Sequence, residues 1–157
     1  MRPVVIAVLL VWLAYACGGG ANENATSTAN EPTPTETATP NDGKGVGEIK
    51  EVTLNNPLKP EMVEKGKAIY EMKCSACHKL TDQRVVGPGW AGITERRKPV
   101  WIMNMITNVD MMLAEDPEAQ KLLEECLTRM PNQNVSVGDA RDILEFMYAN
   151  DAGTVEK

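Results

Sequence analysis

Histidine and aromatic residues are scarce in this sequence. Its 157 residues include one histidine, His78, and seven aromatic residues, of which one is phenylalanine. A single imidazole excludes any site that needs two histidines from the same monomer. So few aromatic side chains also give a small domain little apolar interior of its own, because a short chain buries a limited fraction of its surface.

The sequence also has no excess of basic residues and no long hydrophobic run. The formal net charge is -6, which argues against nucleic acid as a partner. An acidic surface favours encounter with a protein that carries a basic patch, although it serves solubility equally well. The apolar run near the N-terminus, residues 4–16, has 13 residues and is too short to cross a bilayer as a helix.

The N-terminus has the pattern of an export signal. A basic residue, Arg2, precedes the apolar run, so we expect residues 1–16 to be a signal peptide. Cys17 directly follows Ala14-Tyr15-Ala16, which resembles a bacterial lipoprotein signal. This resemblance predicts a lipid anchor at Cys17, on the periplasmic side of a bacterial membrane. A soluble secreted protein with a free thiol at Cys17 is the alternative.

Composition divides the rest of the chain in two. Residues 17–50 are rich in Gly, Asn, Thr and Pro without hydrophobic periodicity, which predicts the anchor cysteine followed by a disordered tether. Such a tether would let a domain reach two partners, or only hold it clear of the lipid surface. Residues 51–157 carry helical apolar patterns and are expected to form one folded domain.

The most specific motif is Cys74-Ser75-Ala76-Cys77-His78, a Cys-x-x-Cys-His sequence. This spacing is that of a c-type haem attachment site. Two thiols three positions apart on one helical turn can each form a thioether with a vinyl group of the porphyrin, and the histidine then binds the iron. We therefore predict one covalently bound haem c per chain, attached at Cys74 and Cys77, with His78 as an axial ligand.

Three other interpretations of this motif stay open. A zinc site would use Cys74, Cys77, His78 and Cys126, although the sequence has no second closely spaced ligand pair. A thioredoxin-like dithiol would need a preceding strand, whereas the residues before Cys74 have a helical pattern. The third is a chance match. With two thiols assigned to haem and Cys17 to the leader, no disulfide framework is available, and Cys126 is expected to be a small buried apolar residue.

The second axial ligand must be a residue other than histidine. Nine methionines are present, and most lie in helical apolar patterns that ordinary core packing explains. Met130 differs because it ends a predicted helix, precedes Pro131 and is followed by a turn-rich segment. It is therefore the candidate ligand, with four alternatives: Met103, Met105, Met111 and Met112.

Taken together, the haem motif, Gly87-Pro88, Met130-Pro131 and a closing amphipathic helix resemble a class I cytochrome c over residues 58–150. The resemblance implies that the carbonyl group of Pro88 accepts a hydrogen bond from the ring of His78. It also implies that Met130 is the second iron ligand. A thioether ligand would raise the reduction potential relative to a second imidazole, and two protein ligands would leave no position on the iron for a substrate.

The apolar patterns predict an all-α domain of about four helices around the haem. One helix is expected from Pro60 to about Lys73, and the last begins near Ser136. Two stretches between them, opening at Pro99 and at Asp116-Pro117, present wide apolar faces that are expected to line the haem pocket. In the resembled family the two terminal helices cross, which here would bring Phe146 or Tyr148 against Gly66 and Tyr70.

Two further side chains are candidates for contacts with the haem propionates. Arg96 lies in a basic cluster and could bind a carboxylate through its guanidinium group, and Trp101 could donate its indole N–H. A solvated loop is the alternative for this cluster. Trp90 has no assigned role.

These features predict a carrier of single electrons rather than an enzyme. We expect a quinol-oxidising complex as the donor and a terminal reductase or oxidase as the acceptor, both outside the cytoplasmic membrane. Two alternatives stay open. One is a gas-binding or sensory haem module in which Met130 dissociates, and the other is a haem subunit of a larger enzyme complex.

Overall fold

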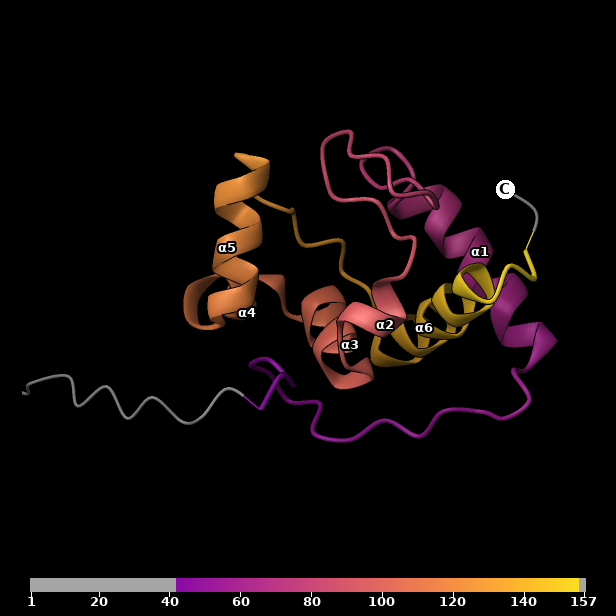
Figure 1. Cartoon of the computed structure of the whole chain (residues 1–157). Coiled ribbons are helices and arrows are strands. Elements are labelled where there is room, and N and C mark those ends of the chain that lie inside the picture. The colour runs from indigo at the N-terminus through magenta and orange to yellow at the C-terminus, as the bar shows by residue number, and fades with distance from the viewer. Residues whose placement is uncertain (1–41, 156–157) are drawn as a thin grey trace, which may run out of the picture. The chain divides into compact units, whose positions relative to one another are not determined.

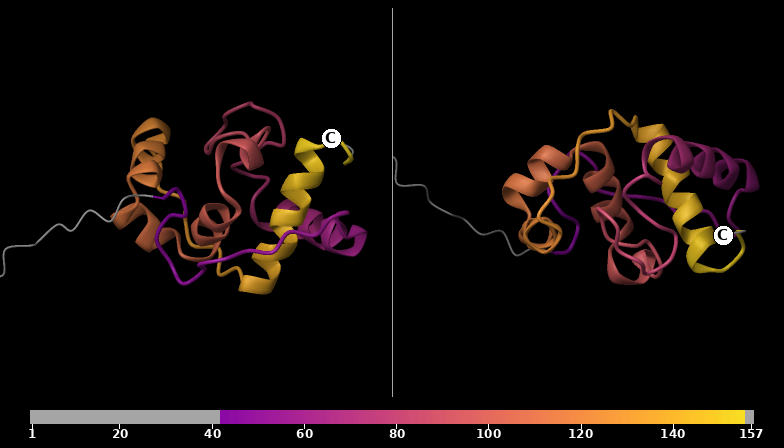
Figure 2. Two further views of the ribbon diagram at one scale, coloured as in Figure 1. Left: turned by 60° about the horizontal axis from the view of Figure 1, so that its bottom comes forward. Right: turned by 90° about the horizontal axis from the view of Figure 1, so that it is seen from above.

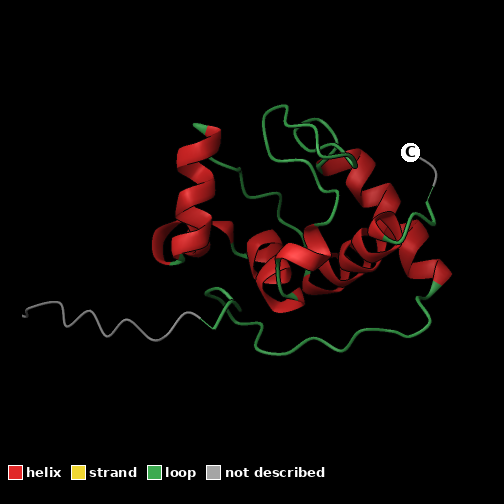
Figure 3. Ribbon diagram, in the orientation of Figure 1, coloured by secondary structure: helices red, strands yellow, loops and turns green. Residues whose placement is uncertain are grey.

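A computed structural model describes residues 42–155, and this part of the chain is helical with no β-strand (Figure 1, Figure 3). Its helices are α1 (Pro60–Lys73), α2 (Ile93–Arg96), α3 (Pro99–Thr107), α4 (Val109–Glu115), α5 (Pro117–Cys126) and α6 (Val137–Asp151). The all-α prediction is confirmed. The predicted signal peptide, Cys17 and most of the predicted tether lie outside the described residues. Within them, no helix combines the length and apolarity that a membrane span requires.

Four of these helices lie where the sequence predicts them. Proline occupies the start of α1, α3 and α5, where its missing N–H costs nothing because that group has no helical partner. At α6 the side chain of Ser136 accepts a hydrogen bond from the N–H of Asp139 at 3.1 Å, which caps the first turn.

Two short helices, α2 and α4, are additional to the predicted four. A single residue, Asn108, separates α3 from α4, and the apolar pattern of the sequence continues across this break, so the sequence predicts one stretch where the structure has two helices. Helix α2 has only four residues and is held by α6, because Asp151 accepts hydrogen bonds from the N–H groups of Gly92 and Thr94 at 2.7 and 2.9 Å.

Helices α1 and α6 cross in close contact (Figure 2). At the crossing, a Cβ atom on Gly66 would stand 2.1 Å from the backbone oxygen of Asp142 in α6, so the helices approach at a distance that only glycine permits. One turn later the rings of Tyr70 and Phe146 lie 5.5 Å apart between centroids. The predicted contact of Gly66 and Tyr70 with Phe146 is confirmed.

The core is built mainly from α3 and α6. Both helices are largely buried, which fits the apolar pattern of their sequences. The buried apolar residues of α3 are Val100, Trp101, Ile102, Met103 and Ile106, and those of α6 are Ala140, Ile143, Leu144, Phe146, Met147 and Ala149.

Residues 42–50, predicted to belong to the disordered tether, pack instead against the folded domain. The buried side chain of Asn104 accepts a hydrogen bond from the N–H of Ile49 at 3.2 Å and donates to the backbone oxygens of Lys44 and Ile49. The N–H of Val46 lies 3.1 Å from the sulfur of Met112. A buried asparagine that pairs with backbone makes this packing specific, and composition alone does not reveal it.

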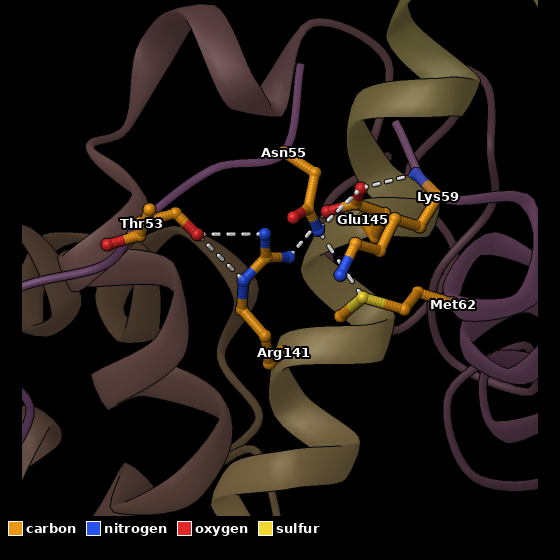
Figure 4. A network of polar contacts seen from close by, with 6 residues as sticks. All are labelled: Thr53, Asn55, Lys59, Met62, Arg141 and Glu145. Atoms are coloured by element: carbon orange, nitrogen blue, oxygen red, sulfur yellow. Dashed lines mark hydrogen bonds and ion pairs between the residues drawn. The ribbon is translucent and has the colours of Figure 1, made fainter. Parts of the chain in front are cut away.

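The segment continues to α1 through a second buried polar group, the carboxylate of Glu145 (Figure 4). This fully buried group accepts hydrogen bonds from the N–H of Lys59 at 2.8 Å and from the amide of Asn55 at 3.1 Å. It also pairs with Arg141 at 2.6 Å, and Arg141 in turn donates to the backbone oxygen of Thr53. Three groups of the segment before α1 are therefore tied to one turn of α6.

This network makes the stability of the domain sensitive to acid. Burial alone would raise the pKa of Glu145, but the Lys59 N–H, the Arg141 guanidinium and the Asn55 amide together hold that pKa below its ordinary value of 4.5. A depressed pKa in the folded state contributes stability above the ordinary carboxyl range and loses it as pH falls through the folded-state pKa.

We expect Glu145→Gln to lower the free energy of unfolding by about 2 kcal/mol at pH 7, because an amide keeps only one acceptor oxygen and its NH2 group would face either Arg141 or the donors of Lys59 and Asn55. The difference between variant and wild type should shrink as pH falls below 4.5, the ordinary pKa of the group, toward its lower pKa in the folded state. Chemical denaturation at a series of pH values measures both effects, and a difference that stays constant down to acid pH would contradict this role for Glu145.

Candidate haem-binding site

A cavity of about 380 Å³ lies between the segment that follows α1 and the wall formed by α3, α5 and the segment after α5. Its lining is almost entirely apolar, and its volume falls in the range of ligand sites. The residues that line it include Cys77, His78, Gly87, Pro88, Trp90, Trp101, Met105, Cys126, Met130 and Met147. Apolar side chains of both α3 and α5 face it, as their sequence patterns predict.

The haem motif continues α1 by one turn. The N–H groups of Cys74 and His78 donate to the backbone oxygens of Tyr70 and Cys74 at 2.9 Å, so the motif keeps a helical form. Burial raises the pKa of the Cys74 thiol to about 11. Redox-active dithiols instead need a lowered thiol pKa, so the site does not suit thioredoxin-like chemistry. Across residues 42–155, no three Cys, His or acidic residues gather as a metal site, which counts against zinc.

His78 is oriented by the chain that follows it. Its Nδ1 lies 2.8 Å from the backbone oxygen of Pro88, the pairing that the family resemblance implies. A carbonyl group only accepts, so Nδ1 must carry the proton and Nε2 keeps its lone pair for a metal. Burial also lowers the pKa of His78, despite the opposing effect of the Pro88 carbonyl, and this favours the neutral, metal-binding ring.

Two neighbours fix the ring of His78 more closely. A Cβ atom on Gly87 would lie 2.4 Å from Cε1 of His78, so this glycine leaves the space that the ring occupies. Trp90, for which the sequence predicts no role, is buried with its ring 5.6 Å from that of His78 and 4.9 Å from that of Tyr70. The hydroxyl of Tyr70 donates to the backbone oxygen of His78 at 2.8 Å.

We expect Gly87→Ala to displace the imidazole ring and weaken its bond to iron. The contact falls on a ring held by a hydrogen bond, so neither side can yield freely. The visible spectrum of the purified variant should show a mixture of iron coordination states. A six-coordinate spectrum identical to that of the wild type would contradict the tight fit. Gly153→Ala offers a control, because nothing lies within 4 Å of a Cβ atom there, although its positive φ of 70° adds local backbone strain.

The structure separates the candidate methionine ligands. Met130 is half-buried and lines the cavity, as does Met105 of α3. Met103, Met111 and Met112 do not line it. Met147 of α6 also lines the cavity, although its place in a helical apolar pattern predicts only core packing. Met130 therefore stays the candidate ligand. Of the four alternative methionines, only Met105 lines the cavity.

The geometry counts against both predicted propionate contacts. Trp101 lines the cavity, but its indole N–H donates to the buried carboxylate of Asp116 at 3.0 Å and is therefore already satisfied. Arg96 is exposed and does not line the cavity. Its guanidinium donates to the backbone oxygens of Ala91 and Gly89, which braces the loop that ends in Trp90.

The prediction of a buried Cys126 is wrong. This cysteine is half-buried and lines the cavity at the end of α5, where only Ala119 is fully buried. The apolar face of α5 therefore lines the ligand cavity as well as packing against the protein core. Helical spacing cannot distinguish these two surroundings, because both are apolar.

The residues present fit haem c. The apolar cavity is lined by the neutral imidazole of His78, whose Nε2 has a free lone pair, and by the thioether of Met130. The thiol of Cys77 also lines it, and Cys74 lies three positions earlier on the same turn. Thiols for covalent attachment and one nitrogen ligand plus one sulfur ligand are the donor set of a haem c with His/Met coordination.

Comparison with known proteins agrees with this site. The family model described as "Cytochrome c" matches residues 63–150. A cytochrome c from Rhodothermus marinus, solved as a structure, is 33% identical, with a TM-score of 0.66 over 68% of this chain and 91% of the other. An engineered form of that cytochrome (Rma TDE), bound to a carbene intermediate, is 33% identical over the same shares with a TM-score of 0.62. A search of curated protein sequences finds no match. The chain belongs to the cytochrome c family, and its cofactor is covalently bound haem c.

Proposed function

We propose that this cytochrome c carries single electrons between respiratory proteins, with His78 and Met130 as the two iron ligands. The observation that carries the proposal is one cavity lined by both residues, in which the ring of His78 is neutral and held at Nδ1 by Pro88. Bound haem c supplies a one-electron couple between ferric and ferrous iron.

The residues of the protein would bind the haem, orient the ring of His78 and shield the site from water. Cys74 and Cys77 attach the group, and the Pro88 carbonyl fixes the tautomer of His78 and increases its basicity. The apolar wall of α3 and α5 excludes water, and a thioether at Met130 favours the reduced state. If His78 and Met130 both bind the iron, no position on it would remain for a substrate, so the carrier would transform none.

The leader supports a location for this function. A signal peptide at residues 1–16 and a lipid on Cys17 would place the domain on the periplasmic side of a bacterial membrane, at the end of a tether. There it would accept electrons from a quinol-oxidising complex and pass them to a terminal reductase or oxidase. Mass spectrometry of the mature N-terminus tests the anchor, since a free thiol at Cys17 would leave the protein soluble.

The electron-carrier proposal is tested by a redox titration of the purified holoprotein with visible spectroscopy. A single reversible one-electron transition is expected, with a sulfur-to-iron charge-transfer band in the ferric state. A holoprotein that shows no such band, or that is not reduced and reoxidised reversibly, would argue against the proposal.

A second candidate function, a gas-binding or sensory module, has one observation in its favour. The engineered Rhodothermus marinus cytochrome was solved with a carbene intermediate bound, so a protein of similar fold can accommodate an added ligand once engineered. Carbon monoxide added to the ferrous holoprotein separates the two functions. Slow or negligible binding at neutral pH is expected for the carrier, whereas rapid binding with a large spectral change would favour the sensor.

A further inference from the structure

An exposed arginine joins the loop that follows His78 to the end of α5, a few residues before Met130. Arg84 belongs to the loop that follows the haem motif, and Glu125 belongs to the last turn of α5. The Arg84 guanidinium donates to the backbone oxygen of Glu125 at 2.9 Å and to its carboxylate at 3.2 Å. Both side chains are about half exposed, at 47% and 42%.

A lysine makes a second connection between the chain around His78 and the chain around Met130. Lys73, the last residue of α1, directly precedes Cys74, and its Nζ donates to the backbone oxygen of Gln133 at 3.0 Å. Gln133 lies three residues after Met130, and both Lys73 and Gln133 are half-buried.

The two contacts connect the same two segments of the chain, one at each end. Lys73 and Arg84 flank the segment that carries Cys74, Cys77 and His78, whereas Glu125 and Gln133 flank the segment that carries Met130. Each contact joins the first segment directly to the second without passing through the core. The span between Glu125 and Gln133 has no regular structure after α5 ends, so it depends on such contacts for its position.

We propose that Arg84 and Lys73 are positioning residues that hold the Met130 segment against the His78 segment and so limit the exchange of Met130 for a competing iron ligand. This inference rests on the proposed function, which makes Met130 an iron ligand. These two contacts, Arg84 with Glu125 and Lys73 with Gln133, are the clasps. Neither residue touches the haem-binding cavity itself.

The expected size of the effect follows from the chemistry of the contacts. Exposed ion pairs and charge-assisted hydrogen bonds of this kind contribute modestly, so loss of one clasp should weaken closure of the Met130 segment about threefold. A competing ligand binds only the open form, so its apparent affinity rises in proportion to the open fraction. Loss of both clasps should therefore tighten binding of a competitor about tenfold, since the two lie at separate sites.

Titration of the ferric holoprotein with imidazole tests the clasps. The visible spectrum records the replacement of the sulfur ligand by imidazole and so gives the apparent affinity. The variants are Arg84→Gln, Lys73→Gln and the double variant, each checked first for one haem per chain. The conservative variant Arg84→Lys should bind imidazole less tightly than Arg84→Gln, with an affinity between that variant and the wild type. Lys44→Gln is the matched control, because it removes an exposed ion pair with Asp42 that lies away from the cavity.

The same substitutions in a Met130→Ala background show whether the clasps act through Met130. There the ligand to be displaced is already gone, so Arg84→Gln should leave imidazole affinity unchanged. Far-UV circular dichroism during denaturation should give nearly the same unfolding midpoint for all clasp variants, whereas a merely structural role would lower it in step with the spectral change.

Three outcomes decide between the claims. Tighter imidazole binding in the clasp variants but not in the Met130→Ala background supports the inference. Unchanged affinity in the double clasp variant, with Met130→Ala tightened as expected, overturns the inference and leaves the proposed function standing. Unchanged affinity in Met130→Ala itself overturns the ligand assignment, and the inference falls with it.

Discussion

Replacing Met130 by alanine is expected to abolish the sulfur-to-iron charge-transfer band and to lower the reduction potential. The thioether stabilises ferrous iron, and an alanine leaves that position to water or another weak ligand. A fall on the order of 0.1 V is reasonable, since axial ligation spans about 0.8 V in haem proteins. Ligand binding to the ferrous iron should become fast in the same variant.

Met105→Leu is the matched control for this substitution. Met105 lines the same cavity from α3, so its replacement alters the apolar wall without removing the predicted ligand. The charge-transfer band should persist and the potential should change little. A band that survives in Met130→Ala and disappears in Met105→Leu would contradict the assignment and move the ligand to α3.

A second large effect is expected at the helix crossing. Gly66→Ala should lower the free energy of unfolding by about 3 kcal/mol, because overpacking at a rigid contact is costly. The new Cβ would stand 2.1 Å from the backbone oxygen of Asp142 and 2.8 Å from Cβ of Phe146, so α1 and α6 would have to move apart. Denaturation followed by far-UV circular dichroism measures the loss.

Gly138→Ala in the first turn of α6 is the control for this prediction. A Cβ atom there would meet only the hydroxyl of Ser136, at 3.8 Å. Since alanine has the higher helix propensity, this variant should be unchanged or more stable by up to about 1 kcal/mol. Equal stability of Gly66→Ala and the wild type would contradict the close crossing of the two helices.

The fold was predictable where local signals are strong. Proline at the first helical position marks α1, α3 and α5, and Ser136 marks α6, because each satisfies a local backbone requirement that the sequence states directly. The break between α3 and α4 was not predictable, since apolar periodicity continues across Asn108. The packed segment at residues 42–50 depends on Asn104, some 55 residues away, and no local pattern reveals such a partner.

The site shows the same division between local and tertiary information. The spacing of Cys74, Cys77 and His78 encodes its chemistry within one helical turn, and the resemblance supplies Pro88. Roles that depend on tertiary neighbours were not accessible. Trp101 donates to Asp116 rather than toward a propionate, and the placement of Trp90 against His78 has no signature in the sequence.

The most direct test of the account is the intact mass of the mature protein made by a cell that attaches haem c. We expect the polypeptide mass plus one haem, with the added mass on a peptide that contains Cys74 and Cys77. A mature chain that carries no haem, or that carries it on a peptide without these two cysteines, would contradict the account.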